Sequence, residues 1–220
     1  EYVFHLSLLG ATLEKIAIEV RNLQRTEIGE VAEYFKKGQM GSSAVPVKRN
    51  PIKSERISSL SKLLRSQVST SFENIPLWHE RDLSNSANER FVIPMTSILV
   101  DEMLETMIRI VENLHVNTKR VKDNLNITKG QIFAEFVLEA LIKKGMPRFK
   151  AYRDVQRVAF DAHKKEINYI DALLNDKSIS NILSDKEIKS IFVAENHLGA
   201  SLIIIDNVNK HVKLYSKKFS

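Results

Sequence analysis

The chain has 220 residues, of which 43% are hydrophobic and 27% charged, so it can bury one large core or two modest ones. It has no cysteine, which excludes a disulfide framework, a thiolate metal site and a cysteine nucleophile, and which suits a reducing compartment. The formal net charge is +6. No apolar run approaches the roughly 18 residues of a membrane span, and no signal peptide opens the sequence. These features predict a globular, cytoplasmic protein.

The first predicted element is one long helix. The sequence opens Glu-Tyr-Val-Phe inside an apolar period, with no capping residue and no initiator methionine, which predicts that the chain is part of a longer protein. The apolar residues recur in alternating steps of 3 and 4, like a coiled-coil seam, so this helix should pack against other helices. The seam consists of Leu6, Leu9, Leu13, Ile16, Val20 and Leu23.

A loop over residues 39–51, QMGSSAVPVKRNP, interrupts the helical pattern. Between Lys36 and Arg65 eight cations accompany a single anion, Glu55. Such a run is often only a solvated basic face, and the alternative is an anion-binding site. Aromatic residues do not alternate with the cations and no helix-turn-helix is legible, so a small polyanion fits better than nucleic acid.

Two further helices are predicted in the first half of the chain. The second should begin at Asn50 and Pro51, because asparagine caps free amides and proline suits the first helical position. A polar, charged stretch then leads to the third helix, where Pro94 should either begin or kink it. The apolar stripes are Ile57, Leu60, Leu64 and Val68 in the second helix and Ile98, Leu99, Met103, Met107, Ile110 and Leu114 in the third.

Shorter helical units follow from about residue 119. One closes on Gly145, the next opens at Pro147, and Ser184 and Glu187 form a predicted capping box. The β-branched run at 201–208 could be a strand, but with no other strand to pair with it we expect a helix. The sequence therefore predicts an all-α protein: a long-helix bundle over residues 1–118 and a smaller helical domain over 119–220.

Four segments of the sequence carry a family resemblance. The stretch GSSAVPVKRNP resembles the signature loop GSSxMPxKxNP of the fumarase/aspartase superfamily. Its continuation KRNPIKSER, the later WHERDLSNSANER and the stretch AYRDVQRVA are similar to the adenylosuccinate lyases within that superfamily. The resemblance covers essentially the whole chain, but only the C-terminal portion of such an enzyme, so the bundle is identified as a truncated central domain.

The resemblance implies β-elimination of fumarate from adenylosuccinate, and from the succinyl-aminoimidazole-carboxamide ribotide of purine biosynthesis, without a cofactor. Removing a proton next to a carboxylate builds up charge there, so the site needs a base, a fixed cation and aligned donors. By resemblance Ser42 is the base and Lys48 the cation, and arginine forks hold the phosphate and carboxylates. The implied substrate-binding residues are Ser43, Asn50, Arg56, Arg81, Ser86 and Arg90.

Three positions depart from the family pattern. Val45 and Val47 replace a methionine and a histidine of the signature loop, and Asn85 replaces a histidine of the later motif. The family's general acid is a histidine that precedes the matched portion, and His79 is interpreted as a loop or packing residue. The chain alone is therefore expected to be inactive. The six histidines form no pair at the spacing of a helical zinc site, so no structural metal is expected.

The resemblance also implies a homotetramer whose active sites are shared between subunits and whose substrate is a small nucleotide. The apolar seams of the first and third helices suit that assembly, although an ordinary intrachain core would explain them equally. Two alternatives remain open at this point: another fumarate-releasing lyase, of the argininosuccinate lyase or aspartase type, and a non-catalytic helical scaffold or nucleic-acid-binding module.

Overall fold

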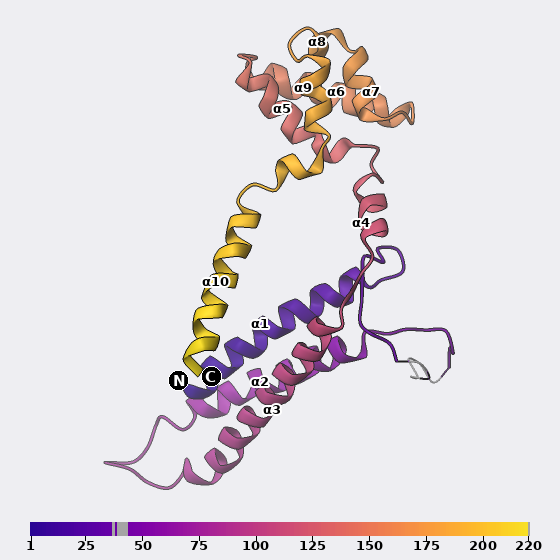
Figure 1. Ribbon diagram of the computed structural model, residues 1–220. Helices are drawn as coiled ribbons and strands as arrows, with labels where there is room; N and C mark the ends of the chain where they lie inside the picture. Colours follow the sequence, from indigo (N-terminus) through magenta and orange to yellow (C-terminus); the bar gives the residue numbers. More distant parts are fainter. Residues whose placement is uncertain (37, 39–43, 220) are drawn as a thin grey trace. The chain divides into compact units, whose positions relative to one another are not determined.

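The computed structural model describes residues 1–36, 38 and 44–219, which fold into two compact units, residues 1–122 and 123–220. In the first unit the helices α1 (Tyr2–Leu23), α2 (Ile52–Phe72) and α3 (Ser86–Glu112) lie side by side as a bundle (Figure 1). Pro94 lies inside α3 rather than at its start. Nine buried apolar residues form the bundle core: Leu13, Ala17, Val20, Ile57, Leu64, Val100, Met103, Met107 and Ile110.

Small residues on α1 set how closely it packs on α2. Its buried positions are Val3, Ser7, Gly10, Leu13, Ala17 and Val20. The Ser7 hydroxyl donates a hydrogen bond of 3.1 Å to the carbonyl oxygen of Leu64 on α2. A Cβ atom added to Gly10 would lie 2.5 Å from a methyl carbon of Leu64. Larger side chains at Ser7 or Gly10 would therefore disturb the contact between the two helices.

The predicted apolar seams only partly coincide with this core. On α1 Leu13 and Val20 are buried, but Leu9 and Ile16 are 37% and 43% exposed. On α3 Met103, Met107 and Ile110 are buried, whereas Ile98 is 67% exposed. Leu9, Ile16 and Ile98 therefore lie outside the core of the single chain, because α1 and α3 each carry apolar residues on more than one face.

A small β-ladder closes one end of the bundle. The two-residue strands β1 (Val31–Ala32) and β2 (His115–Val116) pair antiparallel, with Val31 opposite Val116. The Arg120 guanidinium, from helix α4 (Thr118–Leu125), donates to the carbonyl oxygens of Ile28 and Glu27 at 2.9 and 2.8 Å. The ladder was not expected from the sequence, since strands of two residues leave no periodic signal.

The second unit has its own helical core and ends in a long helix whose described side chains are exposed. In chain order its helices are η1 (Gln131–Phe133), α5 (Ala134–Lys143), α6 (Arg148–Lys164), α7 (Tyr169–Asn175), α8 (Lys177–Ser180), α9 (Asp185–Ile191), η2 (Ala194–His197) and α10 (Ser201–Phe219). The capping box at Ser184 and Glu187 is present with both hydrogen bonds. The run 201–208 is helical, as expected. The core includes Val137, Leu141, Val158, Tyr169, Leu173, Ile179 and Ile188.

The all-α prediction is confirmed, with the two-residue ladder as a minor addition. No helix in the described part of the chain combines the length and the apolar character that crossing a membrane requires.

Candidate active site

The C-terminal part of the predicted signature loop borders a cleft of about 950 Å³. Lys48 and Asn50 line it, whereas Ser42 and Ser43 lie outside the described residues. The opposite lining comes from the last turns of α1 and from the ladder. The remaining polar and charged residues of the cleft are Arg21, Asn22, Gln24, Arg25, Thr26, Arg49, Glu55, His115 and Asn117.

The cleft is cationic. Arg21, Arg25, Lys48 and Arg49 line it with one carboxylate, Glu55, and Arg25 also pairs with Glu27 at 3.5 Å. The Arg21 guanidinium donates to the Ser58 hydroxyl at 3.0 Å, and the Arg49 guanidinium lies 5.7 Å from the centre of the Phe35 ring. A cleft with this excess of fixed positive charge favours an anionic ligand carrying carboxylates or a phosphate. Of the basic run, Lys48 and Arg49 line this cleft, and an anion site there stays a prediction.

The predicted cap of α2 is wrong. The helix begins at Ile52, its N-cap residue is Pro51, and no cap hydrogen bond comes from a side chain at that position. The Asn50 carbonyl oxygen instead accepts the Ile52 amide at 2.9 Å. The first amides of α2 are bound by the side chain of Glu33, whose carboxylate accepts the amides of Lys53 and Ser54 at 3.2 and 2.7 Å. A carboxylate also suits the positive end of the helix dipole.

Arg56 lies one turn into α2 and points to a neighbouring helix. Its guanidinium donates to the Glu102 carboxylate on α3 at 3.1 Å, and the two side chains are 58% and 45% exposed. An exposed pair of this kind contributes little to stability, so substrate could displace it at small cost. Arg56 stays a predicted substrate-binding residue, on the cleft-proximal end of α2.

Arg81, Ser86 and Arg90 lie at the other end of the bundle, where α2 ends and α3 begins (Figure 1). Arg81 and Arg90 are exposed, and Ser86 is half-buried as the first residue of α3. The side-chain amides of Asn74 and Asn88 hold this end together by exchanging two hydrogen bonds of 2.7 Å. The structure thus gathers these three predicted residues at one end of the bundle.

Asp82 organises the loop that carries Arg81. Its carboxylate accepts the Ser84 amide at 2.8 Å, the Ser84 hydroxyl at 2.6 Å and the Trp78 amide at 3.0 Å. The hydrogen bonds from Ser84 hold the pKa of Asp82 below its usual value. His79, in the same loop, is exposed and has a positive φ of 47°. The loop interpretation of His79 is confirmed.

The structure keeps the two groups of predicted residues apart within one chain. Helix α2 has 21 residues and is therefore about 30 Å long. It separates Lys48 and Asn50 at its beginning from Arg81 and Arg90 beyond its end. A single bundle therefore carries the predicted site residues as two separate groups, or half-sites.

Asn85 is buried at the start of α3 and faces its own helix. Its side-chain amide donates to the Glu89 carboxylate at 3.1 Å, and among the described residues its Oδ1 atom has no hydrogen-bond partner. The replacement of the family's histidine therefore adds no titratable group at this end of the bundle.

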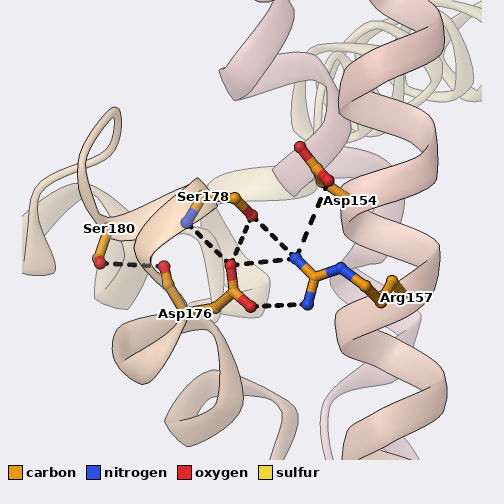
Figure 2. Close-up of polar contacts among 5 residues, drawn as sticks. All are labelled: Asp154, Arg157, Asp176, Ser178 and Ser180. Atoms are coloured by element: carbon orange, nitrogen blue, oxygen red, sulfur yellow. Dashed lines mark hydrogen bonds and ion pairs between the residues drawn. The ribbon is translucent and has the colours of Figure 1, made fainter.

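The AYRDVQRVA stretch has a structural role in the second unit. Figure 2 shows Arg157 of α6 reaching Asp176 with both terminal nitrogens, at 2.8 and 3.2 Å, while Asp154 lies beside the same guanidinium. Asp176 is the N-cap of α8 and also accepts the amide and hydroxyl of Ser178. This fork joins α6 to the α7–α8 connection.

Sequence reasoning missed the residues that are distant in sequence from the signature loop but line or support the cleft. Arg21 is on the last turn of α1, Gln24 is its C-cap and Arg25 follows, while His115 lines the cleft from β2. Glu33 follows β1 and binds Gln24 through its backbone amide. Gln24 and Glu33 carry no local signal, because their hydrogen bonds join residues 9 to 25 positions apart.

Known proteins match the chain in both units. Residues 130–208 match the family described as "Adenylosuccinate lyase C-terminus", and residues 1–64 match the family described as "Lyase". The chain is 44% identical over 191 residues to the adenylosuccinate lyase of Thermotoga maritima, covering 87% of this chain and 44% of the relative. It is 46% identical over 199 residues to that of Synechocystis sp., covering 90% and 46%.

Solved structures agree on the fold. The crystal structure of 3-carboxy-cis,cis-muconate lactonizing enzyme from Pseudomonas putida superposes with a TM-score of 0.84 and 27% identity, over 97% of this chain and 48% of that one. Fumarate lyase from Mesorhizobium sp. BNC1 gives a TM-score of 0.82 with 23% identity, over 94% and 45%. The fold is thus that of the helical lyases of the fumarase/aspartase superfamily.

Within that superfamily, the matches to the C-terminal family and to the two curated relatives are specific. The chain thus resembles the C-terminal portion of adenylosuccinate lyases over about nine-tenths of its length. It spans somewhat less than half the length of the curated relatives it matches.

Proposed function

We propose that the protein containing this chain is an adenylosuccinate lyase, which releases fumarate from adenylosuccinate to give AMP and from the succinyl-aminoimidazole-carboxamide ribotide of purine biosynthesis. The observation that carries the proposal is the identity of 44% and 46% to adenylosuccinate lyases over about nine-tenths of the chain. The cationic cleft at Lys48 and Asn50 supports it, because both substrates are polyanions. We place this activity in the cytoplasm and require no cofactor, membrane or nucleic acid for it.

The proposed catalytic residues act on the succinyl group of the substrate. The Ser42 oxygen removes the proton next to a carboxylate of the succinyl group, and the Lys48 ammonium stabilises the charge that develops on that carboxylate. The electron pair then forms the double bond of fumarate, the carbon–nitrogen bond breaks, and the leaving nitrogen receives a proton from a general acid. In the resemblance this acid is a histidine outside the 220 residues, so we expect the chain alone not to turn over.

The two half-sites call for more than one subunit. Because Lys48 and Asn50 are about one helix length from Arg81 and Arg90, we propose that the cleft of one subunit faces the arginine end of another. Apolar side chains left exposed on α1 and α3, including Ile16 at 43% and Ile98 at 67%, support burial between subunits. The assembly we propose is a homotetramer with shared sites, in which Ser43, Arg56 and Ser86 complete the contacts to substrate.

The proposal is tested with the full-length protein and adenylosuccinate, following fumarate release by absorbance. Wild type should turn over, and Ser42→Ala should abolish turnover while leaving nucleotide binding largely intact. The Arg81→Ala and Arg90→Ala variants should raise the KM for a phosphate-bearing substrate. A full-length protein that binds but never cleaves adenylosuccinate would contradict the proposal, and an unchanged KM would make the two arginines surface residues only.

A further inference from the structure

We propose that Gln24 and Glu33 are positioning residues of this lyase, which hold the backbone of Lys48, Arg49 and Asn50 against the cationic cleft. The inference rests on the proposed function for its kinetic consequence, and on hydrogen bonds of the first unit for its geometry. Neither residue belongs to the signature loop or to the predicted set of substrate contacts.

Gln24 ties the loop to the end of α1 through both ends of its side-chain amide. The residue is the C-cap of α1 and is half-buried. Its Nε2 atom donates to the carbonyl oxygen of Arg49 at 2.9 Å, and its Oε1 atom accepts the Glu33 amide at 2.9 Å. A carboxamide has both a donor and an acceptor at one tip, so each bond fixes the orientation of the amide for the other.

Glu33 ties the same region to the start of α2. It is 9% exposed, and one carboxylate oxygen accepts both the amide and the hydroxyl of Ser54, at 2.7 and 2.6 Å. The other oxygen accepts the Lys53 amide at 3.2 Å. These amides begin a helix and lack a carbonyl partner within it, so a buried carboxylate is a strong acceptor for them.

Together the two side chains clamp a short stretch of backbone at both ends. Gln24 binds it at Arg49, and Glu33 binds it at Lys53 and Ser54. Asn50 lies between the two anchors and Lys48 lies one residue before the first. Arg21 is on the last turn of α1 and Arg25 directly follows Gln24, so the clamp sets the spacing between these two cations and those of the loop.

The kinetic consequence follows from what Lys48 does. A cation that stabilises developing charge must lie at the right place when the charge appears, and a misplacement of about 1 Å can cost on the order of 100-fold in rate. Binding of the intact substrate also uses distant arginines, so it depends less on this position. Loss of the clamp should therefore lower kcat much more than it raises KM.

The test uses the full-length enzyme with Gln24→Glu. This change keeps the acceptor for the Glu33 amide but places an oxygen against the Arg49 carbonyl. We expect kcat to fall by about 10- to 100-fold with KM changed less than about 3-fold. Gln67→Glu is the matched control, since it makes the same chemical change near the end of α2, where the half-buried Gln67 donates to the Leu63 carbonyl oxygen and the Ser66 hydroxyl of its own helix. It should retain the wild-type kcat.

Hydrogen–deuterium exchange of the peptide spanning residues 46–54 gives a readout that does not depend on activity. Exchange should rise in Gln24→Glu and in Glu33→Gln, and should stay unchanged in Gln67→Glu. A normal kcat together with normal exchange in Gln24→Glu would overturn the inference. The inference would also be overturned if kcat fell only as much as the fraction of folded enzyme falls, because Gln24 would then have a purely structural role.

Failure of the inference can be told from failure of the proposed function. If the wild-type enzyme does not release fumarate from adenylosuccinate, the proposed function fails, and the exchange experiment alone then decides whether the clamp exists. If wild type is active and Gln24→Glu is equally active with unchanged exchange, only the clamp is refuted.

Discussion

At the scale of single residues, the Asp176 carboxylate of the second unit accepts hydrogen bonds from both Arg157 and Ser178 (Figure 2). The Arg157 guanidinium and the Ser178 donors lower its pKa from an ordinary 3.8 to about 2. The carboxylate is therefore more acidic in the folded chain than in the unfolded one. The stabilisation that follows is fully present above about pH 4 and is lost as the pH falls toward 2.

Replacing Asp176 with asparagine should reveal this contribution. We expect Asp176→Asn to lower the free energy of unfolding at pH 7 by about 1 to 3 kcal/mol, because the charge-assisted fork to Arg157 is lost, although the asparagine oxygen can still cap α8. The loss should shrink between pH 4 and pH 2, measured by denaturant unfolding across that range. Asp206→Asn on the exposed α10 is the control. A loss that does not change with pH would contradict the assignment.

At the scale of elements, the contact between α1 and α2 depends on the absence of a side chain at Gly10. Alanine is usually the better residue inside a helix, by about 1 kcal/mol. Here the added methyl would lie 2.5 Å from a methyl carbon of Leu64, a side chain that is fully buried. Overpacking of this kind costs about 1 to 3 kcal/mol, so the close approach should outweigh helix propensity.

Gly10→Ala should therefore destabilise the bundle, by roughly 1 to 2 kcal/mol in denaturant unfolding. In a Leu64→Ala background the same change should be neutral or stabilising, since the clashing methyl group is gone. The double-mutant cycle supplies its own control. Equal effects of Gly10→Ala in both backgrounds would show that α1 and α2 are not in close contact there.

Local rules predicted the helices better than the faces they bury. Gly145, Pro147 and Ser184 mark helix ends because the reason is contained in a few neighbouring residues, and the structure has those ends. The 3-and-4 spacing could not show that Leu9 and Ile16 would stay exposed, because periodicity identifies an apolar stripe and not what covers it.

For the candidate site, too, the sequence predicts local motifs better than tertiary contacts. The signature motif singles out Lys48 and Asn50, and both line the cleft. The predicted role of Asn50 as the cap of α2 is wrong. Glu33, which accepts the first amides of α2, is about 20 residues away in sequence. It reaches these amides only because the chain folds back on itself. Contacts that depend on tertiary approach leave no pattern in a single sequence.

At the scale of the whole molecule, the separation of the half-sites predicts complementation between inactive enzymes. In full-length protein, Lys48→Ala should lose most of its kcat, and Arg90→Ala should be severely impaired at substrate concentrations well below its raised KM. Subunits of the two variants that are unfolded together and refolded should regain up to about a quarter of wild-type activity, since each half of a site then comes from an intact subunit with even chance. Each variant refolded alone is the control. No recovery in the mixture would place both residues in one subunit's site.

The ladder of β1 and β2 also has a consequence for the order of folding. It joins Val31 to Val116, so it closes a stretch of chain that contains α2 and α3 entirely. Contacts that span so many residues form slowly, whereas the α5–α9 cluster is assembled from neighbours in sequence. Pulse-labelled refolding should therefore show the amides of α5 to α9 protected first and those of the ladder last, although the ladder belongs to the half that the ribosome delivers earlier.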